Sequence, residues 1–91
     1  MDEIETLESN DDFSFFVPFL EVKKANRVME YVEDYLAGNG YRNGYYFYLS
    51  CSEIKRYGSY FTKFTFSGKK FKPELKEMIK TSLIQAIAIR R

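Results

Sequence analysis

Few side chains in this sequence have intrinsic chemical reactivity. Cys51 is the only cysteine and histidine is absent, so neither a Ser-His-Asp nor a Cys-His catalytic arrangement can be built. The Cys and His sets that hold structural zinc are excluded for the same reason. Cys51 also falls on the core-facing register of a predicted strand, where a thiol behaves as an inert small hydrophobe. The sequence therefore predicts a non-enzymatic protein with no catalytic residue, metal site or cofactor.

Aromatic and basic side chains form the most informative pattern. Residues 45–52 and 60–67 alternate as two strands of a hairpin, and one face of each is apolar. The opposite face and its adjoining turns carry aromatic and basic residues, namely Tyr46, Tyr48, Phe61, Lys63, Arg56, Lys69, Lys70 and Lys72. Bases of a single strand stack on such rings while cations neutralise phosphates. We expect nucleic-acid binding, with RNA and DNA both open; the alternatives are that this face is a homodimer interface or is covered by residues 1–20.

Acidic residues are concentrated at the N-terminus. Residues 1–34 hold ten acids and three bases, a balance of −7, and residues 35–91 hold three acids and eleven bases, a balance of +8; together these give the net charge of +1. The first twelve residues contain six acids and no base: Asp2, Glu3, Glu5, Glu8, Asp11 and Asp12. Such a segment is typical of an acidic tail.

The acidic segment supports a different function. A small regulator or inhibitor, of the kind that phages and mobile elements encode, would bind a host or other partner protein through this tail and an open sheet edge. There are two other interpretations of the tail. It folds back on the basic half of the protein and inhibits binding there, or it acts only as a solubilising segment. These alternatives stay open at the level of sequence.

Five elements are predicted. Residues 13–20 are aromatic-rich and indicate a strand, and residues 23–37 have apolar side chains at helical spacing. The strands 45–52 and 60–67 follow, and Pro73 begins a helix that continues to the C-terminus. The order strand-helix-strand-strand-helix predicts an α+β fold, with a small antiparallel sheet of about three strands packed on one face by two helices. We expect residues 1–12 to form a mobile tail and residues 13–91 a single domain.

The element order is similar to most of an RNA-recognition motif. The segment Arg56-Tyr57-Gly58-Ser59-Tyr60-Phe61 resembles the aromatic central-strand signature of that family, with an added Ser59 and without the family's last strand. A chain of 91 residues and 10.8 kDa holds one small domain. It has no apolar run long enough to span a bilayer and no signal-peptide pattern, so a cytoplasmic protein is expected.

Overall fold

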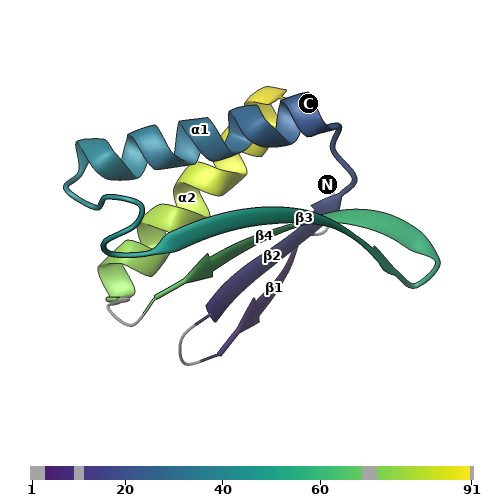
Figure 1. Cartoon of the computed structure of the whole chain (residues 1–91), viewed down its shortest axis with the longest axis horizontal. Coiled ribbons are helices and arrows are strands. Elements are labelled where there is room, and N and C mark those ends of the chain that lie inside the picture. Colours follow the sequence, from purple (N-terminus) through teal and green to yellow (C-terminus); the bar gives the residue numbers. More distant parts are fainter. Residues whose placement is uncertain (1–3, 10–11, 69–71, 91) are drawn as a thin grey trace.

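The computed structural model describes residues 4–9, 12–68 and 72–90. Along the chain it contains the strands and helices β1 (Glu5–Glu8), β2 (Asp12–Pro18), α1 (Val22–Gly38), β3 (Tyr48–Arg56), β4 (Ser59–Ser67) and α2 (Pro73–Arg90). Both helices lie on the same side of the sheet (Figure 1). The predicted α+β class, with two helices covering one face of an antiparallel sheet, is confirmed.

The sheet differs from the prediction in its strand count and in where it begins. Within the described residues it has four antiparallel strands in the order β1-β2-β4-β3, and the additional strand is β1. This strand lies in the segment expected to be a tail, and it pairs Glu5 with Phe16 and Glu8 with Phe13. The sequence Glu5-Thr6-Leu7-Glu8 lacks the aromatic alternation that identified the other strands, so local pattern alone missed it. The fourth strand therefore comes before the first helix, whereas an RNA-recognition motif would have it after the last.

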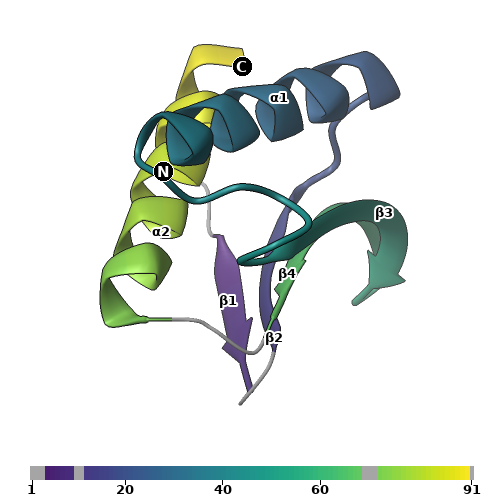
Figure 2. The same cartoon turned by 60° about the vertical axis from the view of Figure 1, so that its left-hand side comes forward.

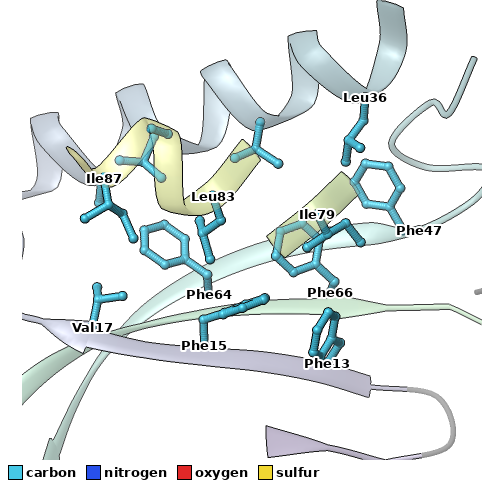
Figure 3. Close-up of a cluster of buried hydrophobic side chains, with 14 of the residues drawn as sticks. Phe13, Phe15, Val17, Leu36, Phe47, Phe64, Phe66, Ile79, Leu83 and Ile87 are labelled. Carbon is cyan, nitrogen blue, oxygen red and sulfur yellow. The ribbon is translucent and has the colours of Figure 1, made fainter. Parts of the chain in front are cut away.

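The core is a layer of aromatic rings between the sheet and the helices. Phe13 and Phe15 from β2 and Phe64 and Phe66 from β4 point toward the helices (Figure 3), and all four are at most 2% exposed. They meet apolar side chains that recur at helical spacing in α2 and α1, namely Leu75, Ile79, Leu83, Ala86, Ile87, Ala25, Val28, Val32 and Leu36. Burying each large side chain contributes about 1.5–3 kcal/mol, so this layer is the main source of stability.

The hairpin of β3 and β4 ends in a tight two-residue turn. Tyr57 has φ +55° and Gly58 has φ +79°, which is the positive-φ pair of a type I′ turn. β3 begins at Tyr48, three residues later than predicted. The preceding residues 44–46 form a turn, closed by the N–H of Gly44 donating to the carbonyl of Phe47 at 2.6 Å.

The far end of this hairpin bends away from the helices. The curvature is visible in Figure 1, and the rotated view in Figure 2 shows β3 curling strongly toward its end. The bend brings the end of β3 over the sheet face that the helices leave open. That face is the one on which the predicted site residues were expected.

Candidate functional site

The strand register places four of the predicted site residues on the open face of the sheet. Tyr48 pairs with Ser67, Phe61 with Ile54, and Lys63 with Ser52. All of these alternate with the core residues Phe64 and Phe66, and therefore point away from the helices. Arg56 shares this side because it is an even number of residues from Tyr48. Tyr48 is 63% exposed, whereas Phe61, Lys63 and Arg56 are half-buried.

Tyr46 is not part of this face, so its predicted position is wrong. It lies in the turn before β3 and packs against the core. Its ring makes edge contacts with Tyr41 and Tyr45, with centroid distances of 5.2 and 4.7 Å. Strand alternation failed here because the turn formed by residues 44–46 occupies the place where the strand was expected to begin.

Arg56 reaches across the open face to β2. Its Cζ atom lies 4.1 Å from the centroid of the Phe16 ring, although Arg56 pairs with Ser59 and Phe16 pairs with Lys63. In a flat sheet the offset of four positions between Ser59 and Lys63 would separate Arg56 from Phe16 by about 13 Å along the strand direction, which is farther than an arginine side chain spans. The bend of the hairpin closes that distance and makes the face concave.

Two cations share the Phe16 ring. The Lys63 Nζ atom lies 5.5 Å from the ring centroid, so Lys63 and Arg56 both fall within the roughly 6 Å range of cation–π attraction. Phe16 is only 5% exposed, since these side chains cover it. Beside them an open pocket of about 220 Å³ is lined by Glu5, Thr6, Leu7, Phe16 and Arg56.

The acidic segment contacts the basic half of the protein on both sides of the sheet. On the open face, Glu5 Oε1 lies 2.5 Å from Arg56 Nη1. On the helix side, the Glu8 carboxylate lies 3.3 Å from Lys76 Nζ and 3.9 Å from Lys80 Nζ. These contacts agree with the interpretation in which the segment folds back on the protein.

The other predicted residues contribute less to the described surface. Asp12 begins β2 and is exposed, and Lys72 is exposed just before α2. The remaining predicted residues, Asp2, Glu3, Asp11, Lys69 and Lys70, lie outside the described residues.

The sequence-based site omitted Tyr57, which is the most exposed aromatic residue at the hairpin end. It is 80% exposed, and its hydroxyl accepts a hydrogen bond from Arg56 Nη2 at 3.1 Å. The guanidinium carbon lies 5.0 Å from its ring centroid. The signal was present, because an aromatic residue before Gly58 in a tight turn has no core to enter.

Cys51 is a half-buried free thiol at the edge of the sheet. Burial raises its pKa above the ordinary value of 9.0, which keeps it protonated and weakly reactive at neutral pH. It helps to line an apolar pocket of about 170 Å³ between α1 and β3, together with Phe19, Val22 and Met29.

Two further properties concern residues 4–9, 12–68 and 72–90. Among these residues, no group of three or more cysteine, aspartate and glutamate side chains is arranged to hold a metal ion. No helix in the same ranges is long and apolar enough to cross a membrane.

Comparison with family models, with curated proteins and with solved structures finds no match to this chain.

Proposed function

We propose that this chain is a small, non-enzymatic binding module of the cytoplasm that holds single-stranded nucleic acid on the open face of its sheet. One observation carries the proposal. Arg56 and Lys63 gather over Phe16 on a concave face, and the exposed ring of Tyr48 and the partly exposed ring of Phe61 occupy the same face. Cationic side chains neutralise the phosphates of a single strand, and aromatic rings stack against its bases.

Exposed aromatic side chains stand at both ends of β3. Tyr48 stands at the start of β3 and Tyr57 at its far end, and their separation of nine residues corresponds to about 30 Å of extended strand, which the bend of the hairpin shortens. Several nucleotides fit within that span. The exposed Ser50 and Ser52 between them offer hydroxyl groups for hydrogen bonds to phosphate or sugar.

Glu5 opposes this binding in the free protein. The Glu5 Oε1 atom lies 2.5 Å from Arg56 Nη1, and a phosphate would compete with this carboxylate for the guanidinium. Arginine binds carboxylates and phosphates with the same fork of N–H groups. The acidic strand β1 therefore acts as an internal counter-ion that a ligand displaces.

Titration of fluorescent single-stranded RNA and DNA oligonucleotides, read by anisotropy at about 50 mM salt, tests the proposal. Tyr48→Ala and Phe61→Ala should each weaken binding by about 5- to 150-fold, because one base stack contributes roughly 1–3 kcal/mol. Lys63→Gln should lower the slope of log affinity against log salt by about one unit.

Tyr35→Ala is the matched control. Tyr35 is also a partly exposed tyrosine, but it lies on α1, so its loss should leave the affinity unchanged. If neither oligonucleotide binds at this salt concentration, or if Tyr35→Ala weakens binding as much as Tyr48→Ala does, the open face is not a nucleic-acid site.

A further inference from the structure

The turn at the end of β3 determines which residues of this strand direct their backbone N–H and C=O groups toward the open edge of the sheet. β3 is the last strand in the sheet order, and Arg56 and Ser59 flank the two-residue turn. The pair that flanks such a turn exchanges both of its backbone hydrogen bonds. The backbone groups of successive residues in a strand point alternately to its two edges. Counting back from Arg56, the N–H and C=O groups of Ile54 and Ser52 therefore face β4, and those of Lys55, Glu53 and Cys51 face outward.

A second, independent contact supports this assignment. The N–H of Leu49, which has the same parity as Cys51, donates to Asn43 Oδ1 at 3.3 Å. Asn43 belongs to the loop before β3 and forms a bridge with Phe47. The loop thus covers the start of the edge, and the part of the strand that remains available runs from Cys51 to Arg56.

The charges on this available segment are self-complementary. Glu53 and Lys55 are exposed, are separated by one residue, and point to the same side of the sheet. Neither takes part in the salt bridges of the described residues. A two-fold axis through Ile54 would place each Glu53 opposite the Lys55 of the other copy, since antiparallel pairing reverses the order of the residues.

We infer that a second copy of this chain binds along the β3 edge, antiparallel and with the two-fold axis at Ile54. Glu53 and Lys55 exchange backbone hydrogen bonds with Lys55 and Glu53 of the second copy, and their side chains form two opposite-charge pairs. On the open face, Ile54 meets its own counterpart in a pair that has no backbone hydrogen bonds. This inference does not depend on the proposed nucleic-acid ligand.

Other positions of the axis fit poorly. An axis on Glu53 or on Lys55 places like charges directly opposite each other, which destabilises a strand pair. An axis on Ser52 places Lys55 opposite Leu49, whose N–H already donates to Asn43. An axis at Ile54 pairs the outward backbone N–H and C=O groups of the two copies and also places opposite charges next to each other.

The apolar surface beside the edge favours the same arrangement. Phe19 is 48% exposed and Val22 is 73% exposed, and both line the pocket that Glu53 also borders. A second copy at this edge extends the sheet and adds its own side chains next to that surface. Because the axis is perpendicular to the sheet, both open faces remain on the same side.

Charge reversal tests the register by sedimentation equilibrium over about 10 µM to 1 mM protein at low salt. Glu53→Lys and Lys55→Glu each convert both opposite-charge pairs into like-charge pairs, and each should weaken dimerisation at least about tenfold. An equimolar mixture of the two variants should form heterodimers, because each lysine then faces a glutamate. The Glu53→Lys/Lys55→Glu double variant should recover the wild-type dimer.

Cross-linking provides a second measurement. In a Cys51→Ser background, Ile54→Cys places two thiols opposite each other at the axis, and a short thiol-to-thiol cross-linker should join the two chains. Ser50→Cys lies on the same face but outside the paired segment, so it should stay uncross-linked. Circular dichroism establishes that each variant is folded.

The inference is supported if the wild type dimerises, each reversal alone weakens dimerisation at least about tenfold and the mixture restores the wild-type affinity. It is overturned if the wild type stays monomeric throughout the concentration range. It is equally overturned if the single reversals dimerise as tightly as the wild type, if the mixture dimerises no more tightly than either variant alone, or if Ser50→Cys cross-links as well as Ile54→Cys does. Failure of oligonucleotide binding would leave each of these outcomes unchanged, so the two proposals are judged separately.

Discussion

Replacing Glu5 by glutamine should have opposite effects on stability and on nucleic-acid affinity. The substitution keeps the size of the side chain and removes its charge, so Arg56 loses its ion pair. The Arg56 and Glu5 side chains are 29% and 52% exposed, and solvent screens the interaction accordingly. A partly exposed pair of this kind contributes about 0.5–1 kcal/mol, which is the expected loss in the free energy of unfolding.

The same free energy should appear as a gain in binding. In the proposed complex a phosphate displaces Glu5 from the Arg56 guanidinium of the wild type, whereas in Glu5→Gln the guanidinium is already available. A gain of about 0.5–1 kcal/mol corresponds to roughly two- to fivefold tighter binding. The gain should be largest at low salt and should shrink as salt screens the Glu5–Arg56 pair in the wild type.

Glu8→Gln separates this local effect from a change in net charge. It removes the same unit of charge from the same strand, but its contacts are Lys76 and Lys80 on the helix side. Urea denaturation followed by circular dichroism measures stability, and oligonucleotide anisotropy measures affinity. If Glu5→Gln and Glu8→Gln raise the affinity equally, net charge explains the gain and the competition at Arg56 is refuted.

Three further predictions concern the core, the turn and the thiol. In a urea titration, Leu83→Ala should lower the free energy of unfolding by about 2–5 kcal/mol, because Leu83 is fully buried. The neighbouring Ile84 is 48% exposed, so Ile84→Ala should lower it much less. Tyr57→Asn should raise the thermal midpoint, because asparagine tolerates the observed φ of +55°; a lower midpoint would show that the contacts of Tyr57 with Arg56 outweigh backbone preference. The pKa of Cys51 is raised in the folded state above 9.0, so its contribution to stability is complete below that pH and is lost as pH rises through the folded pKa. Cys51→Ser should flatten the fall in stability at alkaline pH, and iodoacetamide should modify the native thiol more slowly than the unfolded one at pH 9.0; equal rates would contradict the shift.

The helices and the central strands could be predicted because each has a strong local pattern. The alternation of Phe64 and Phe66 with polar residues set the buried face of β4, and the helical spacing of Val28, Val32 and Leu36 set that of α1. Each of these patterns can be recognised from residues that are close together in the sequence. They led to the correct fold class and to the correct face for Tyr48, Phe61 and Lys63, whereas Arg56, which was expected in a turn, is the last residue of β3.

What the sequence did not show depends on contacts between distant residues. β1 has an exposed side chain at every position and exists because β2 offers it an edge, so its own composition does not identify it. The bend that carries Arg56 to Phe16 is likewise a property of the assembled sheet. Tyr46 was misplaced for a local reason, because a turn closed by Gly44 occupies the position expected for the strand.

The order of strands also has a consequence for how the chain folds. The pairs β1–β2 and β3–β4 each join strands that are neighbours in sequence, so either hairpin can form with little loop-closure entropy. The pair β2–β4 instead joins Asp12 to Ser67 and Val17 to Thr62, which closes a loop that contains α1 and the whole of β3. Contacts with such long sequence separation slow folding. We expect joining of the two hairpins to limit the folding rate, so that substitutions in β2 and β4 slow folding whereas those in β1 mainly speed unfolding.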